Sequence, residues 1–283
     1  MNIQTLEKTF AKIGASVEIR RSNPNRRPAR FQRSIGSMSP SAGPFSVNVE
    51  GTGKREHFVL TIDPDANVEF DALDVSPETR HMILQARPIN IENTKNAPRT
   101  EKFLCGHDEM HFFAASVPST VTKVRDAKDR LMPQGVQEHV RNVGLNRKEK
   151  FKRKNQAYIR QGEWFFIPEP GKTIDKKFIL YNEPLIRPGG GKPHMMGECY
   201  REGGTTVWTK GSLMNVLSVS QYDQLTKRDS KEAMRYRQMR RNPMVWCRGK
   251  IKHPDHHTID LGYVWHRVSV NGEIRAQSLG FFD

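Results

Sequence analysis

Short runs of alternating apolar and polar residues recur along the chain, and this pattern constrains the fold more than any other feature of the sequence. FSVNVE (45–50) and HFVLTI (57–62) flank the turn-like GTGKRE, which is the pattern of a β-hairpin. FLCG (103–106) and HFFAASV (111–117) flank a second polar turn in the same way. Further strands are expected at 81–89, 157–168, 177–181, 205–209, 244–251 and 257–270. Because strands and helices do not alternate regularly, the sequence predicts an α+β fold that is mostly antiparallel β-sheet.

A few segments have the spacing of apolar residues that is typical of helices. Helices are expected over 3–14, 119–131, 212–226 and 229–241. Ser119 or Thr120 can cap the second of these helices at its N-terminus. Asp229, followed three residues later by Glu232, gives the last one a capping-box pattern.

The organisation of the chain suggests two sub-domains. Residues 133–156 contain little core material and end in a basic run. We therefore expect an N-terminal α+β domain over 1–145, which carries an Arg-rich arm at 17–44. The C-terminal, β-rich domain covers 146–283 and carries a basic helical insertion at 212–241.

Several classes of protein do not fit this composition. No stretch approaches the ~18 apolar residues that a membrane span needs, so no membrane partner is expected. The three cysteines, Cys105, Cys199 and Cys247, are odd in number and widely spaced, so no disulfide framework is implied. A reducing, cytoplasmic location is the expectation. The sequence does not indicate an oligomeric state.

Positive charge is concentrated in three tracts. The net charge is +15, and the tracts at 17–34, 147–154 and 227–252 hold 22 of the 46 basic side chains but only 4 of the 31 acidic ones. The rest of the chain has a net charge of −3. Bringing such tracts together on one surface costs free energy, which a polyanion offsets by releasing its condensed counterions. The pattern favours a nucleic-acid partner over a merely solvated surface.

The glycine run at 187–194, RPGGGKPH, is a further candidate for phosphate contact. Backbone N–H groups of such a run can wrap phosphate oxygens, with Lys192 and His194 at its end. The alternative is a simple connector, since the Walker A spacing is absent. The side chains expected to bind nucleic acid are Arg20, Arg21, Arg26, Arg27, Arg30, Arg33, Lys148, Lys150, Lys152, Arg153, Lys154, Lys192, His194, Arg235, Arg237, Arg240 and Arg241.

Aromatic residues lie next to these cations and suggest which nucleic acid is preferred. Aromatic side chains beside basic ones suit stacking on unpaired bases, although most of these rings are expected in the core. No helix-turn-helix, zinc finger, RRM signature or KH loop is present. RNA or single-stranded DNA is therefore the preferred partner. Composition alone does not separate this from an interaction or inhibitor protein that binds an acidic protein.

The densest histidine segment of the chain is KHPDHHTI (252–259). A pair of histidines with a nearby cation can cleave phosphodiesters, one as base and one as acid. An enzyme of this class, a nuclease or phosphodiesterase, would use His256, His257 and His266, with Lys252 or Arg267 stabilising charge. The alternatives are phosphate contact without catalysis and a plain polar turn.

A second histidine group occupies the turn between 103–106 and 111–117. On a continuous strand His107, Glu109 and His111 point the same way and could bind a divalent metal as a cofactor. The HExxH motif is absent, because the glutamate stands third and not second in the pentad. The alternative is a hairpin tip whose polar side chains face water.

Overall fold

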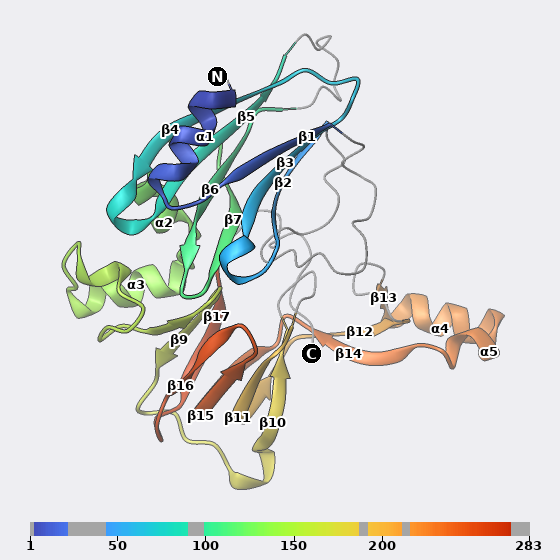
Figure 1. Ribbon diagram of the computed structural model, residues 1–283. Coiled ribbons are helices and arrows are strands. Elements are labelled where there is room, and N and C mark those ends of the chain that lie inside the picture. Colours follow the sequence, from blue (N-terminus) through green and yellow to red (C-terminus); the bar gives the residue numbers. More distant parts are fainter. Residues whose placement is uncertain (1–2, 22–43, 90–98, 187–191, 211–215, 273–283) are drawn as a thin grey trace. The chain divides into compact units, whose positions relative to one another are not determined.

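β-Strands form most of the regular structure, and the expected α+β fold with mostly antiparallel sheets is confirmed (Figure 1). The computed structural model describes residues 3–21, 44–89, 99–186, 192–210 and 216–272. The chain divides into two compact units between Met132 and Pro133. This division precedes the expected one at 145/146, because Val136 and Val140 give helix α3 (Gln134–Val143) a buried face that packs against β9 (Trp164–Pro168).

The first unit contains two sheets. Its elements are α1 (Ile3–Lys12), β1 (Val17–Arg21), β2 (Phe45–Glu50), β3 (His57–Ile62), β4 (Val68–Ser76), β5 (His81–Pro88), β6 (Glu101–Asp108), β7 (His111–Val117) and α2 (Val124–Leu131). One sheet has the order β1-β3-β2 and the other β4-β5-β6-β7. All pairs in them are antiparallel except β1 with β3. Both expected hairpins, 45–62 and 103–117, are present.

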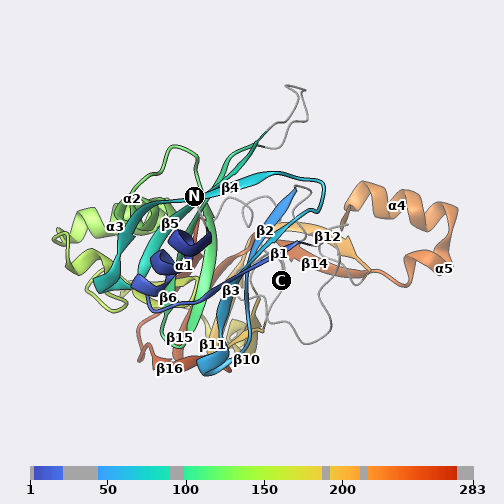
Figure 2. The ribbon, with the colours of Figure 1, turned by 45° about the horizontal axis from the view of Figure 1, so that its top comes forward.

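One core joins the two sheets and α1, which lies against β4 (Figure 2). The fully buried Phe58 of β3 contacts Phe10 of α1 and Phe112 of β7, with ring centroids 4.9 and 5.4 Å apart. The other face of the β4–β7 sheet is covered by α2. Strands β5 and β6 are thus buried on both faces near their centres, which is why 82–84 and 103–106 are short continuous apolar runs.

The second unit is built on a sheet with the order β10-β11-β15-β17-β9-β8, and β16 pairs with β15 beside this path. In addition to α3 and β9, its elements are β8 (Ile159–Gln161), β10 (Leu180–Leu185), β11 (His194–Glu202), β12 (Thr205–Thr209), β13 (Val216–Ser218), α4 (Val219–Arg228), α5 (Ser230–Ala233), β14 (Arg237–Arg241), β15 (Met244–His253), β16 (His256–Asp260) and β17 (His266–Val270). Its core lies under β9, β11 and β15.

An insertion interrupts this sheet between β11 and β15, which pair with each other directly. It consists of a three-stranded sheet, β13-β12-β14, with α4 and α5 between β13 and β14 (Figure 1). The chain leaves the main sheet at Gly204 and rejoins it after Pro243. At Gly204, the φ of +81° and a distance of 3.0 Å between a Cβ and the Arg241 carbonyl oxygen favour glycine over residues with a side chain.

Three of the expected helices differ from those in the structure. Within the expected helix 212–226, residues 216–218 form strand β13, and helix α4 begins at Val219. The predicted helix 229–241 ends after one turn, and 237–241 is strand β14, because it pairs with β12 from Thr205 to Thr209. Asp229 does cap α5 by accepting the Glu232 N–H at 3.0 Å, as expected. Neither Ser119 nor Thr120 caps α2, which begins at Val124 and is capped from another strand: the Val124 N–H donates to Asp74 of β4 at 2.8 Å.

Four further elements have no counterpart in the sequence-based expectations: β1, which lies in the expected arm, and β4, β11 and α3. The pairing register shifts in both β4, between Ala72 and Asp74, and β11, between Met196 and Glu198. Each shift breaks the alternation of apolar and polar residues that indicates a strand.

Among the described residues no helix is both long and apolar enough to cross a membrane.

Candidate functional site

Three histidines meet where three neighbouring strands of the second unit begin or end. His194 is the first residue of β11, His253 the last of β15 and His256 the first of β16. His253 and His256 are direct partners in the β15–β16 hairpin. The neighbouring register, Met195 opposite Lys252, places His194 beside His253. The strand pairing therefore brings together residues that are about 60 positions apart in the sequence.

The three imidazole rings form one tight group, the His cluster. The ring centroids of His194 and His253 are 4.1 Å apart, those of His253 and His256 4.7 Å, and those of His194 and His256 5.6 Å. Their candidate ligand atoms all lie within 4.8 Å of one another. The His194 side chain is buried, with 1% of the residue exposed, whereas His253 and His256 are half-buried. The cluster thus has an inner wall and a side that reaches the surface.

Polar neighbours hold His253 in place. The Lys192 carbonyl lies 3.1 Å from its Nε2, and the Asp255 N–H donates to its Nδ1 at 3.1 Å. The Lys192 ammonium and the Asp255 carboxylate form an ion pair at 2.7 Å. Burial lowers the pKa of His253, and the positive charge of a protonated His256 lowers it further. The ring therefore favours its neutral form at neutral pH.

The turn between β8 and β9 closes one side of the cluster. The Gln161 side-chain amide donates to the His257 carbonyl at 2.6 Å. Gly162 follows with a φ of +56°, and a Cβ there would lie 2.8 Å from Nε2 of His256. Trp164 meets the His194 ring edge-on at 6.3 Å. A glycine is needed because both the backbone angle and the closeness of His256 exclude a side chain.

The residues expected to cleave phosphodiesters do not come together as one set. His256 joins the His cluster, but the neighbouring His257 and Lys252 are exposed. His266 is buried opposite Cys247, six positions along β15 from His253, which is about 20 Å in an extended strand. Burial also lowers the pKa of His266. Arg267 is held by Glu169 at 2.8 Å.

The sequence indicated two members of the His cluster, His194 and His256, but assigned them to different sites, and it did not indicate His253. His194 was expected to contact phosphate, and His253 was not among the expected site residues. The spacing of His253 and His256 across Pro254-Asp255 fits a tight hairpin, and this signal could have paired them. Nothing local in the sequence connects them with His194.

The structure does not place His107, Glu109 and His111 on one face of a continuous strand, which the expected metal site required. The hairpin turns at Glu109, which has a φ of +43°, so that His107 lies opposite Phe112 and not beside His111. His111 instead contacts the buried Glu56 carboxylate at 2.9 Å. Throughout the part of the chain that the structure describes, the His cluster is the one group of three whose ligand atoms converge.

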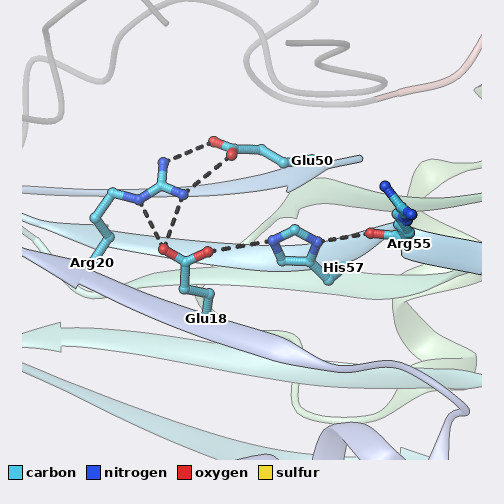
Figure 3. Close-up of polar contacts among 5 residues, drawn as sticks. All are labelled: Glu18, Arg20, Glu50, Arg55 and His57. Atoms are coloured by element: carbon cyan, nitrogen blue, oxygen red, sulfur yellow. Dashed lines mark hydrogen bonds and ion pairs between the residues drawn. The ribbon is translucent and has the colours of Figure 1, made fainter. Parts of the chain in front are cut away.

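The described end of the first basic tract is engaged within its own sheet (Figure 3). Arg20 donates to Glu18 at 2.9 Å and to both carboxylate oxygens of Glu50, at 3.2 and 3.3 Å. These carboxylates raise the pKa of Arg20. Arg21 donates to the carbonyls of Pro64 and Ala66. The other arginines expected to bind in this tract, Arg26, Arg27, Arg30 and Arg33, lie outside the described residues.

The second basic tract is a well-defined loop. Asn146 accepts the N–H groups of Lys148 and Glu149 at 3.0 Å, and Asn155 donates to the carbonyls of Glu149 and Lys152. The Tyr158 hydroxyl donates to the Lys150 carbonyl, and the Lys150 ammonium lies over the Phe151 ring. Five side chains of this tract were expected to bind nucleic acid. Lys148, Lys152 and Lys154 are exposed, and Lys150 and Arg153 are half-buried.

The third tract runs through the insertion and beyond it. Arg237 and Arg240 are exposed on β14, Arg241 is half-buried, and the Arg235 side chain is 67% exposed. Arg240 donates to the Gly203 carbonyl at 2.6 Å, and Arg235 contacts Glu232 at 3.3 Å.

Comparison with known proteins gives no independent assignment of this site, since the chain matches no family model, no curated protein and no solved structure.

Proposed function

We propose that the chain binds nucleic acid, with RNA or single-stranded DNA preferred, through basic side chains of its second unit. The observation that carries this proposal is the charge of the insertion. Its described residues, 205–210 and 216–241, hold eight basic side chains against three acidic ones.

Two of these three carboxylates are engaged inside the insertion. Asp229 caps α5, and Glu232 contacts both Lys210, at 2.6 Å, and Arg235. Eight basic and three acidic side chains still leave an excess of five positive charges in the described part of the insertion, whereas Arg20 in the first unit is paired with Glu18 and Glu50. A phosphate backbone would supply the missing negative charge.

The loop at 147–154 supports the same proposal. Its backbone is fixed by asparagine and tyrosine hydrogen bonds, so the loop does not have to be ordered when a ligand arrives. A preorganised loop loses less conformational entropy on binding.

Aromatic rings in the insertion support the preference for unpaired bases. Trp208 and Tyr222 stack in parallel at 3.6 Å, and Tyr236 lies 6.5 Å from Tyr222. Tyr236 is half-buried and stands in the sequence between Arg235 and Arg237. A ring between two arginines can stack on a base while the guanidinium groups hold the adjacent phosphates. A cytoplasmic location remains part of this proposal, and the buried thiols of all three cysteines are compatible with it.

The test is the salt dependence of binding to a labelled RNA oligonucleotide, measured by fluorescence anisotropy. We expect the logarithm of the binding constant to fall linearly with the logarithm of salt concentration between about 50 and 200 mM. The double variant Arg235→Gln/Arg237→Gln should make this negative slope shallower by about 1.4, since each phosphate contact on a single strand contributes about 0.7 to its magnitude.

Lys176→Gln/Lys177→Gln is the matched control, because it removes two exposed positive charges from another part of the same unit. It should leave the slope unchanged. A response that is flat in salt, or equal loss in the control, would contradict the proposal and favour an acidic protein partner instead.

Phosphodiester hydrolysis is the second candidate function, and the convergence of His194, His253 and His256 favours it. Neighbouring imidazoles can act as general base and general acid. The labelled RNA should then be cleaved by the wild-type protein and not by His253→Ala, as seen by gel electrophoresis with and without added Zn²⁺. Intact RNA in every sample would remove this candidate without affecting the binding proposal.

A further inference from the structure

We propose that the His cluster binds a divalent transition-metal ion, with Zn²⁺ as the best fit, through one ring nitrogen each of His194, His253 and His256. This goes beyond nucleic-acid binding and does not depend on it. The site is not the one that the sequence indicated, and its three ligands come from three different strands.

The distances are close to those of a bound ion. A tetrahedral zinc with Zn–N bonds of about 2.0–2.1 Å places its nitrogen ligands about 3.4 Å apart. The candidate ligand atoms already lie within 4.8 Å of one another, so small changes of side-chain torsion are sufficient. The backbone does not need to move, because His253 and His256 are paired in the hairpin and His194 begins the adjoining strand.

The donor set selects among metals. Three imidazole nitrogens suit zinc, copper, nickel and cobalt, whereas magnesium and calcium require oxygen ligands. The carboxylate of Asp255, which lies in the turn between His253 and His256, is already paired with Lys192 at 2.7 Å. The cluster therefore offers nitrogen rather than oxygen.

The surroundings resemble the outer shell of a metal site. Both ring nitrogens of His253 have partners, the Lys192 carbonyl and the Asp255 N–H, each at 3.1 Å. A metal bound at Nδ1 would take the place of the Asp255 N–H, and the Nε2–H group, donating to the Lys192 carbonyl, would fix the orientation of the ring. Below the cluster, Trp164, Leu185, Met196 and Ile251 form an apolar core.

Burial shows where a fourth ligand would enter. His194 closes the inner side, and the two half-buried rings border the surface. Three protein ligands with one open position are typical of zinc sites that hold a water molecule or a substrate oxygen. The open position would accept an oxygen ligand from solvent or from a phosphate group.

The experiment is a zinc titration of the untagged full chain, with metal content measured by mass spectrometry and affinity by competition with a chromophoric chelator. The wild type should bind one Zn²⁺ per chain, and Co²⁺ in its place should give the visible absorption of tetrahedral nitrogen coordination. His256→Ala should lower the affinity at least about 100-fold, since even changes outside the ligand shell lower it about 10- to 100-fold.

His257→Ala is the matched control, because it removes the adjacent, exposed histidine and should bind zinc like the wild type. Far-UV circular dichroism checks the fold of each variant, and His253→Gln, a change at a half-exposed strand end, provides a second ligand variant. The proposal is overturned if the wild type binds no zinc, if both ligand variants bind it normally, or if His257→Ala loses as much affinity as His256→Ala.

Discussion

Glu56→Ala is expected to lower the free energy of unfolding by about 2–6 kcal/mol, because it leaves two buried groups without their hydrogen-bond partner, at about 1–3 kcal/mol each. The Glu56 side chain is 3% exposed, and its carboxylate accepts from the Phe112 N–H at 2.6 Å and contacts His111 at 2.9 Å. The substitution leaves a buried imidazole and a buried N–H without a partner. Urea denaturation followed by far-UV circular dichroism measures the change.

Glu50→Ala is the control for this prediction. Glu50 also accepts from a basic side chain, Arg20, but that pair is half-exposed (Figure 3). Its loss should cost at most about 1 kcal/mol. If Glu56→Ala lowered the free energy of unfolding no more than Glu50→Ala, the contacts of Glu56 with His111 and the Phe112 N–H would not stabilise the first unit, and the prediction would be wrong.

Trp164→Ala is expected to destabilise the second unit by about 3–5 kcal/mol, the usual range for removing a large aromatic side chain from a core. Trp164 is 2% exposed, packs in the core under β9, β11 and β15, and contacts the ring of His194. The cavity would also loosen the inner wall of the His cluster. Thermal or urea unfolding of the purified variant gives the size of the effect.

Tyr263→Ala is the matched aromatic control, because Tyr263 is 94% exposed. It should change stability by no more than about 0.5 kcal/mol. The remaining tryptophans, Trp208, Trp246 and Trp265, all lie in the second unit and provide a fluorescence signal for it in both variants. Equal stability of the two variants would show that Trp164 is not part of a packed core.

Local patterns in the sequence were sufficient for the hairpins. The turns between 45–50 and 57–62 and between 103–106 and 111–117 join strands that are neighbours in both sequence and space. In each hairpin, the strand and the strand that it pairs with therefore lie within one short segment of the sequence. The same is true of the Asp229 cap, which acts three residues away.

Elements that depend on distant partners were not predictable in this way. The segment 237–241 consists of residues that favour a helix, but its pairing with β12 decides that it is a strand. Helix α2 takes its cap from Asp74, fifty positions earlier, so the nearby Ser119 and Thr120 suggested the wrong start. Tertiary contacts overrode the local signal in both cases.

For the candidate sites, the sequence by itself determined the amount and the grouping of positive charge, because charge is a property of composition. It also showed that histidines are dense at 252–259. Only the tertiary structure decided which charges are neutralised, since Arg20 meets Glu50 across β3, and which histidines converge, since His194 reaches His253 and His256 through strand pairing. Such contacts depend on sheet register, which no single segment of the chain contains.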